Sequence, residues 1–291
     1  MLFLFLSQTS AMQAPDQAPN HTPPVERINE SMGVVLAGFG RPFSEVALRR
    51  ASVLQTQGVA VRVFVDAEML GACNRLCVIV PPEEFHTTAR NGSRLMVGYR
   101  EGKIYAFLHS PWKFTLFIDA DTRFCKPVND ILFTAFHLMR GSDIAGVWPA
   151  WALKGKVLNG GVVFYHRNER TRLLLQAWLR AYRQALRMAG DATQCRNLGK
   201  LRDGCNVSKY GVERVLVQDQ GPLASAISKT QKQAGLRVFR LGVEWNYKQS
   251  ILRGHLRGFV ASSALNSLPC CSNSSVIIHH KCNDTAAGWR R

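Results

Sequence analysis

Two carboxylates separated by one residue follow an apolar run in the middle of the chain. Asp119 and Asp121 stand in LFIDADT, directly after the strand-like run 114–118. In an extended chain, side chains two residues apart point the same way, so these carboxylates converge at the strand end. Carboxylates this close repel each other unless a cation lies between them, and hard oxygen ligands favour Mg²⁺ or Mn²⁺. The motif therefore predicts a divalent metal that bridges the protein to a departing nucleotide diphosphate.

The same pair of residues has other interpretations. A solvated turn at the strand end, with Asp121 capping the next segment, would also produce this pattern. Phosphatases of the haloacid-dehalogenase type use D-x-D-x-T after a strand, but here Arg123 holds the fifth position and the motif lies mid-chain. A sugar nucleotidyltransferase would need a Gly-rich basic loop after its first strand, which GFGR at 38–41 imitates only faintly.

Strand-like and helix-like segments alternate from residue 33 onward. Short apolar runs predict strands, and stretches with a helical period predict helices. The expected strands are 34–37, 59–66, 76–80, 114–118, 144–148, 161–165 and 276–279; the expected helices are 44–57, 94–109, 169–188 and one beginning within 215–227, with a loop at 194–209. This order predicts an α/β fold with a mostly parallel central sheet flanked by helices, whose ligands bind at the carboxyl ends of the strands.

Cysteines and glycosylation sequons indicate the compartment. Eight cysteines favour disulfides over a zinc site, because the number is even and no C-x-x-C pair occurs. The candidate pairs are Cys73–Cys77, Cys195–Cys205 and Cys282 with Cys270 or Cys271. Sequons stand at six positions, more than chance predicts from the Asn, Ser and Thr content: Asn20, Asn29, Asn91, Asn206, Asn273 and Asn283. We therefore expect the secretory pathway, in the lumen of the Golgi or the ER, rather than the cytoplasm.

Charge and hydropathy restrict the partners. The net charge of +17 and the pI near 10 favour polyanions, among them nucleotides, anionic lipids and acidic glycans. Nucleic acid is not an expected partner, because the charges are spread along the chain and no nucleic-acid-binding motif is present. No apolar run reaches the length of a membrane-spanning helix. Attachment to a membrane would need a further N-terminal segment. The apolar residues 1–6 are either the remnant of such a signal anchor or simply a frayed chain terminus.

Four stretches together resemble the GT-A glycosyltransferases, especially the glycogenin-like family 8 and its nucleotide-diphospho-sugar transferase relatives. In family order they are 103–132 around LFIDADT, LNGGVVFY at 158–165, QDQGPLASA at 218–226 and VIIHHK at 276–281. The resemblance implies a Rossmann-like GT-A fold. The Gln-, Pro- and Thr-rich residues 1–30 predict a flexible tail or stalk, a possible remnant of a signal anchor. The resemblance implies one catalytic domain at 31–291, with a nucleotide-binding half at 31–140 and an acceptor half at 141–291.

The resemblance also implies a metal set and a donor-binding set. Asp119, Asp121 and His279 match the ligands of Mn²⁺ or Mg²⁺, and His280 remains an alternative to His279. The implied donor contacts are Ala37, Phe39, Phe43, Arg94, Lys103, Asp119, Gly160 and Lys281. Phe43 replaces the family's stacking Tyr, a change that keeps stacking on uracil but loses a hydroxyl contact. The family's Lys-Pro-Trp after the final His is absent, and Lys281 is the expected substitute.

Three further residues match positions at the reacting sugar. They are Asn159, Asp219 and Gln220, with Asp219 the carboxylate nearest the anomeric carbon. By residue type alone, Asn159 also fits a plain turn. Asp219 also fits the N-cap of a helix, because Pro222 would lie in the first turn. For Lys103, the residue type alone is equally compatible with a surface cation on a helix.

The resemblance thus implies a metal-dependent hexosyl- or pentosyltransferase. It would move a sugar from a nucleotide-diphospho-sugar, a UDP-sugar, to a hydroxyl of a glycan, protein or small molecule, with retention of configuration. The alternative is a catalytically inactive GT-A domain that binds nucleotide sugars or polyanions.

Overall fold

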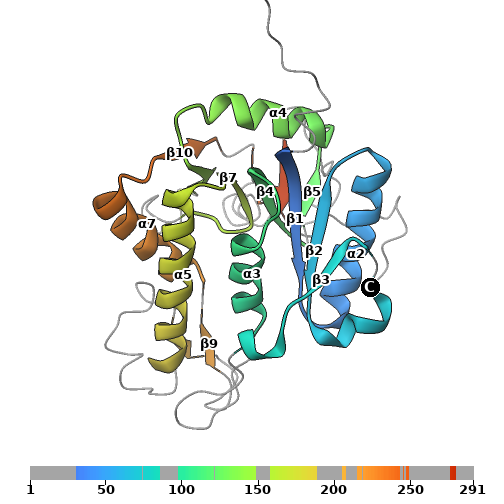
Figure 1. Cartoon of the computed structure of the whole chain (residues 1–291), viewed down its shortest axis with the longest axis horizontal. Helices are drawn as coiled ribbons and strands as arrows, with labels where there is room; N and C mark the ends of the chain where they lie inside the picture. Colours follow the sequence, from blue (N-terminus) through green and yellow to red (C-terminus); the bar gives the residue numbers. More distant parts are fainter. Residues whose placement is uncertain are drawn as a thin grey trace, which may run out of the picture.

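A seven-stranded sheet forms the centre of the protein in a computed structural model (Figure 1). The residues described are 31–73, 75–85, 98–120, 122–148, 158–188, 205–207, 215–217, 219–242, 245, 247–248 and 276–279. In sheet order the strands are β10 (Val238–Leu241), β6 (Ile144–Val147), β7 (Val162–His166), β4 (Phe114–Asp119), β1 (Met32–Gly38), β2 (Val61–Val65) and β3 (Cys77–Ile79). Only β7 is antiparallel to its neighbours β4 and β6 within this sheet, and the other four pairings are parallel. The predicted α/β fold with a mostly parallel sheet is confirmed.

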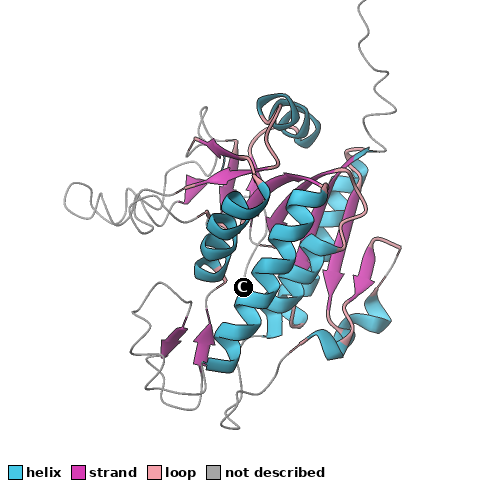
Figure 2. Cartoon of the chain, turned by 60° about the vertical axis from the view of Figure 1, so that its left-hand side comes forward, coloured by secondary structure: helices cyan, strands magenta, loops and turns pink. Residues whose placement is uncertain are grey.

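Helices cover both faces of the sheet. The helices are α2 (Arg41–Thr56), α3 (Gly98–Leu108), α4 (Val128–Leu138), α5 (Glu169–Met188) and α7 (Gln220–Ala234), and the 3-10 turns are η1 (Ala67–Ala72) and η2 (Pro82–Glu84). Alternate strand residues face opposite sides. Val35 and Phe117 pack with α3, α5 and α7, whereas Val34 and Leu116 pack with α2 and α4. In Figure 2 some of the helices lie in front of the strands, and others lie behind or above them.

Two small sheets lie outside the central one. β11 (Tyr247–Lys248) pairs with β12 (Ile277–His279), which runs antiparallel to β5 (Thr122–Phe124). β8 (Cys205–Val207) pairs with β9 (Val215–Val217). The prediction of a loop at 194–209 is therefore wrong where β8 lies. The helix expected to begin within 215–227 begins at Gln220 with Pro222 in its first turn, and the strand β9 (VLV) before it, which contains two β-branched valines, was not expected.

The boundaries of the other elements agree with expectation to within a few residues. The expected strand at 276–279 is β12, and the expected helix at 169–188 is α5. α4, β5, β10 and β11 were not expected from the sequence. Among the described residues, no helix is both long enough and apolar enough to cross a membrane. The sheet contains strands from both proposed halves, 31–140 and 141–291; the domain boundaries themselves stay a prediction.

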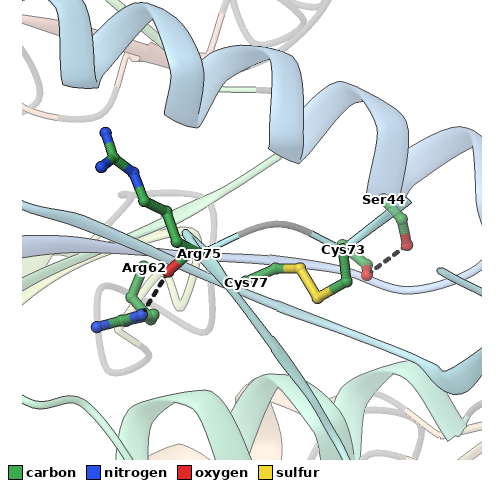
Figure 3. Close-up of a disulfide and its surroundings, with 6 residues drawn as sticks. Ser44, Arg62, Cys73, Arg75 and Cys77 are labelled. Carbon is green, nitrogen blue, oxygen red and sulfur yellow. Dashed lines mark hydrogen bonds between the residues drawn. A yellow bond between two sulfur atoms is a disulfide. The ribbon is translucent and has the colours of Figure 1, made fainter. Parts of the chain in front are cut away.

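A disulfide joins the end of η1 to the start of β3 (Figure 3). Cys73 and Cys77 are bonded with their Cα atoms 5.6 Å apart, which confirms that predicted pair. Inside the loop they close, the Arg75 carbonyl accepts a hydrogen bond of 2.8 Å from Arg62 Nη1 on β2. Cys125, for which the sequence suggested no partner, is also disulfide-bonded. The other two predicted pairs involve Cys195, Cys205 and the cysteines at 270, 271 and 282, whose side chains lie outside the described residues.

One buried carboxylate joins three elements near the β10 edge of the sheet. Asp143 precedes β6 and is fully buried. Its oxygens accept hydrogen bonds of 2.8 Å from Asn168 Nδ2, from Arg170 Nε at the start of α5, and from the backbone N–H of Arg237 before β10. Burial alone would raise the pKa of Asp143, but these donors hold the pKa below its ordinary value. The carboxylate therefore stabilises the fold in its ionised form.

We expect Asp143→Asn to lower the free energy of unfolding by about 2 kcal/mol at pH 7, because hydrogen bonds to a charged group are lost. A group whose pKa is depressed by folding contributes stability above its unfolded pKa, and this contribution disappears as the pH falls through the folded pKa. The difference between wild type and variant should therefore shrink below the unfolded value of 3.8. Urea unfolding at pH 7 and near pH 3 measures this difference in unfolding free energy. The control variant is Asp130→Asn, which replaces an exposed carboxylate on α4. Equal stability of wild type and Asp143→Asn at pH 7 would contradict the assignment.

Candidate active site

The carboxyl ends of β1, β2 and β4 lie side by side. In the register of the sheet, Ala37 on β1 lies opposite Asp119 on β4, and Gly38 on β1 lies opposite Val65 on β2. The chain passes from β1 through α2 to β2 on one side, and returns from β3 through α3 to β4 on the other side of β1. The strand order therefore reverses between β1 and β4. Open α/β sheets bind ligands at such a reversal, just beyond the carboxyl ends of the strands.

Lys103 lies between two carboxylates at this edge. Its Nζ is 2.8 Å from Asp119 Oδ1 and 3.4 Å from Asp219 Oδ2, and its side chain is only 12% exposed. Lys103 comes from α3, Asp119 from the end of β4, and Asp219 from the residue before α7. Gly102 next to Lys103 permits this approach of α3 to the sheet, because a Cβ there would meet the Phe39 ring at 2.3 Å. The interpretation of Lys103 as a surface cation is excluded.

Asp219 is buried and its carboxylate faces cations rather than the helix that follows it. Asp219 stands at the N-cap position of α7, as the alternative interpretation predicted, but its side chain makes no capping hydrogen bond to that helix. Arg100 Nε on α3 lies 3.8 Å from Asp219 Oδ1. The backbone carbonyl of Asp219 accepts a hydrogen bond of 2.9 Å from Trp178 Nε1 of α5. Main chain and side chain of Asp219 are thus held by two different helices.

The charges in this cluster stabilise one another's ionised forms. Burial alone would raise the pKa of Asp219, but Lys103 and Arg100 hold the pKa below its ordinary value. Burial alone would lower the pKa of Lys103, but Asp119 and Asp219 raise the pKa instead. Both groups are therefore charged at neutral pH, and the cluster presents fixed positive and negative charge at the edge of the sheet.

A second ion-pair group supports the first and was not expected from the sequence. Arg183 on α5 contacts Glu101 Oε1 at 3.0 Å and Glu84 Oε2 at 2.8 Å. Glu101 is almost fully buried and lies on α3 between Arg100 and Lys103. The pair therefore ties the helix that carries these two cations to α5. No local pattern identifies Arg183, because its neighbours Arg180 and Arg187 look the same in the sequence.

The turn before β7 lies directly against Lys103. Asn159 is buried, and its Oδ1 accepts a hydrogen bond of 2.9 Å from the N–H of Gly161. A Cβ added to Gly160 would lie 3.5 Å from Lys103 Nζ and 3.6 Å from Asp219 Oδ2. Asn159 thus closes a turn, as its residue type alone allowed, and this turn brings backbone close to the charged cluster.

The predicted nucleotide-binding segment forms the turn from β1 into α2. Phe43 in the first turn of α2 is 59% exposed, so its ring face is accessible to a planar ligand. Phe39 is instead buried and packs edge-on against Phe85. Its side chain belongs to the core, which leaves only its backbone for a ligand. Ala37 is half-buried at the end of β1.

The predicted metal ligands are only partly within the described residues. The backbone of His279 on β12 pairs with that of Thr122 on β5, the residue after Asp121. This register brings the C-terminal strand to the D-x-D motif. Among the residues described, no group of three His, Cys, Asp or Glu side chains could hold a metal ion. That search does not include Asp121 or the imidazole of His279, which lie outside the described residues, as do Arg94, His280 and Lys281. Gln220, the first residue of α7, is half-buried.

Comparisons with known proteins place the chain near a group of solved structures. No family model matches the sequence, and no curated protein matches it. Mouse xyloside xylosyltransferase 1 is similar at 9% identity over 87% of this chain and 98% of that chain, with a TM-score of 0.41. The galactosyltransferase LgtC in complex with donor and acceptor sugar analogues is similar at 12% identity over 86% of this chain and 87% of that chain, with a TM-score of 0.42. The glycosyltransferase GlyE of Streptococcus pneumoniae TIGR4 is similar at 12% identity over 90% of this chain and 57% of that chain, with a TM-score of 0.46.

These structures are all glycosyltransferases. The resemblance noted in the sequence points to the same class. At such identities and TM-scores the matches assign no substrate and no residue role.

Proposed function

We propose that the chain is a metal-dependent glycosyltransferase of the GT-A type. It transfers a sugar from a UDP-sugar to a hydroxyl of a glycan, protein or small molecule, with retention of configuration. The observation that carries the proposal is the cluster of Lys103, Asp119 and Asp219, three residues that match the sequence pattern of the family and that come together from three separate elements.

The charge distribution of the cluster suits a sugar diphosphate. Lys103 and Arg100 are cations at the carboxyl edge of the sheet, where they attract a diphosphate. The Asn159–Gly160 turn precedes β7, which neighbours β4 on the side away from β1, and the turn lies beside Lys103 Nζ and the Asp219 carboxylate. In our proposal the diphosphate lies over β4 and β1, and the sugar points toward Asp219.

The residues present fit a divalent metal. Asp119 ends β4, Asp121 is two residues on, and the strand that ends at His279 pairs with the residue after Asp121. Two carboxylates and an imidazole form a donor set that Mn²⁺ accepts, with Mg²⁺ as the alternative. When bound, the metal would stabilise the negative charge that develops on the leaving diphosphate.

Side chains of the protein would then position the donor sugar and stabilise the charge that develops during transfer. The bond between the anomeric carbon and the diphosphate oxygen breaks, and its electron pair stays with the departing diphosphate. A bond from the same carbon to the acceptor oxygen forms, and the acceptor proton passes to the departing diphosphate or to water. Asp219 provides fixed negative charge beside the carbon that becomes positive, and Gln220 and Asn159 orient the sugar. Trp178, through its hydrogen bond to the Asp219 carbonyl, keeps this carboxylate in place.

We also propose that the protein works in the lumen of the secretory pathway. The Cys73–Cys77 disulfide and the disulfide at Cys125 support this location, because such bonds persist in oxidising compartments. The six sequons give independent support. Occupied glycosylation sites on the protein secreted from cultured animal cells would test it, and an unglycosylated, reduced protein would contradict it.

Donor hydrolysis by the purified chain tests the function. A panel of UDP- and GDP-sugars is incubated with Mn²⁺, with and without EDTA, and the released nucleotide is measured. We expect release from one UDP-sugar that EDTA abolishes. Asp121→Ala should release no more nucleotide than the wild type does in EDTA, whereas Asp130→Asn on the exposed face of α4 should retain the wild-type rate. Release that is unaffected by EDTA would contradict the metal dependence. Binding of donors without turnover would instead favour the inactive, nucleotide-sugar-binding domain.

A further inference from the structure

A cavity of about 330 Å³ lies at the opposite edge of the sheet from Lys103 and Asp219. It is bounded by the last residues of α3, the end of β7 and the first turn of α5. The two helices lie side by side on this face of the sheet (Figure 1). The last residue of β7, His166, pairs with Phe114, the first residue of β4, whereas Asp119 is the last residue of β4. β4 spans about 17 Å between these two ends, so the cavity is separate from the proposed active site.

Part of the cavity lining is apolar and comes from α3, β7 and α5. The residues are Phe107, Leu108, Tyr165 and Leu175. The Tyr165 hydroxyl donates a hydrogen bond of 2.7 Å to the Phe107 carbonyl, so the polar atom of this part already has a partner. The volume of the cavity falls within the range of small-molecule sites, which combine apolar walls with a few polar groups. A ligand here therefore needs one apolar face.

An arginine without an acidic partner also lines the cavity. Arg167 follows β7 directly, is exposed, and forms no ion pair within the described part of the chain. Its backbone N–H donates a hydrogen bond of 2.7 Å to the carbonyl of Lys113, which is a second exposed cation. At the start of α5 the N–H of Thr171 is already bound by Asn168 Oδ1, which caps the helix. The guanidinium of Arg167 is thus the charged donor that a ligand in the cavity would meet.

The same cavity contains an ion pair that remains accessible. Arg172 donates hydrogen bonds of 2.8 Å and 2.6 Å to the two carboxylate oxygens of Glu169. The side chains of Arg172 and Glu169 are 54% and 65% exposed. The Glu169 carboxylate can therefore still accept hydrogen bonds, and it disfavours a ligand that carries only negative charge. The ligand should combine an anionic group with hydroxyls.

This edge of the sheet is basic around the cavity. Six Lys or Arg residues and two acidic residues stand in four connections at this edge, 109–113, 139–143, 166–172 and 235–237. Both acids, Asp143 and Glu169, form ion pairs with neighbouring arginines. Lys113, Arg140 and Arg167 have no acidic partner among the residues that the structure describes, so positive charge remains here and attracts anions.

We propose that this cavity binds one ring of an acidic saccharide, a sugar that carries a carboxylate or a sulfate. The Arg167 guanidinium pairs with the anionic group through two parallel hydrogen bonds. Glu169 and Arg172 bind ring hydroxyls, and the apolar C–H face of the ring packs on the apolar part of the lining. Such a site holds an acidic glycan away from the proposed active site. Binding here is independent of the proposed glycosyl transfer, because none of these residues belongs to the charged cluster around Lys103.

Binding of simple acidic sugars to the full chain tests the proposal. The probes are methyl glucuronide and glucose 6-sulfate, and the comparison ligands are neutral methyl glucoside, acetate and inorganic sulfate. Ligand-observed NMR measures their affinities. We expect at least one acidic sugar to bind about 10-fold or more tightly than every comparison ligand, because only an acidic sugar contacts Arg167 and the rest of the cavity together.

Three variants locate the binding site. Arg167→Gln should weaken the binding of the acidic sugar about 10- to 100-fold, as is typical when hydrogen bonds between charged groups are lost. Leu108→Trp, which fills part of the cavity and leaves the charge unchanged, should weaken it as well. The matched control is Arg75→Gln, which removes an exposed arginine before β3, at the other end of the sheet, and should leave the affinity unchanged.

Several results would overturn the proposal. A wild type that binds neither acidic sugar, or an Arg167→Gln variant that binds them like the wild type, would do so directly. Equal losses in Arg167→Gln and Arg75→Gln would show that only the overall charge matters. Acetate or sulfate that binds as tightly as the acidic sugar would reduce the cavity to a simple anion site. Wild-type affinity in a folded Leu108→Trp protein would place the sugar outside the cavity.

Discussion

Asp219→Asn should lower the rate of glycosyl transfer by about 10²- to 10³-fold, the usual cost of removing one preorganised electrostatic group from an active site. The variant loses the negative charge beside the reacting carbon. It keeps the backbone carbonyl that accepts the hydrogen bond from Trp178, and Lys103 keeps its contact with Asp119. The fold and the nucleotide affinity should therefore change little. The measurements are the transfer rate at saturating donor and the dissociation constant of UDP with Mn²⁺.

The matched control for this prediction is Asp130→Asn, which removes one carboxylate from the exposed side of α4. Its transfer rate should stay at the wild-type level. If Asp219→Asn transfers sugar within threefold of the wild type, Asp219 serves only to balance the charge of Lys103 and has no part in the reaction.

Lys103→Met should destabilise the protein by about 3 kcal/mol at pH 7, toward the lower end of the cost of breaking a buried ion pair. The variant leaves Asp119 and Asp219 facing the same apolar side chain. Asp219 then has only Arg100, at 3.8 Å, as a cationic neighbour among the described ion pairs. The side chain of Asp119 is 28% exposed, and water there limits the penalty. Urea unfolding of wild type and variant measures the difference.

The pH dependence of this difference has a definite sign. In the wild type, Lys103 helps to hold the pKa of Asp219 below its unfolded value of 3.8, so this contribution is present above that pH. Without Lys103, burial should raise the folded pKa of Asp219 above 3.8. The variant is then stabilised as the pH falls through the raised folded pKa toward the unfolded value. The difference in unfolding free energy should thus be largest at neutral pH and decrease toward pH 4.

Two further variants show whether the loss of stability in Lys103→Met comes from the broken ion pairs or from the substitution of a lysine in general. The double variant Lys103→Met/Asp219→Asn should be more stable at pH 7 than Lys103→Met alone, because the unpaired buried charge is gone. Lys113→Met, which removes an exposed cation, should be close to the wild type. A Lys103→Met protein that is as stable as the wild type at every pH would contradict the buried ion pairs.

Much of the fold follows from short-range patterns. Val34–Ala37 and Phe114–Ile118 are strands because apolar, β-branched and aromatic residues fill positions that face both covered sides of the sheet. α5 has the predicted bounds because its apolar residues recur at a helical period over five turns. The three-residue strands β8 and β9 were missed, since each is too short to show a period of its own.

Part of the site follows from the sequence as well. Asp119 was expected at the end of a buried strand and is found there, because a strand end is defined by local polarity. Lys103 and Asp219 were reached only through the family resemblance. Their residue types alone fitted a surface cation and a helix cap equally well.

The sequence by itself determined the order of the main strands and helices, the position of Asp119 at the end of β4, and the overall positive charge. Only the tertiary structure decided that Lys103 pairs with Asp219 across 116 positions of sequence, and that the Asp219 carboxylate faces Lys103 and Arg100 although the residue stands at the N-cap position of α7. The reason is that a residue's own neighbours in sequence set its backbone conformation, whereas the partner of a buried charge depends on which helices pack on which strands. Periodicity carries the first kind of information and not the second.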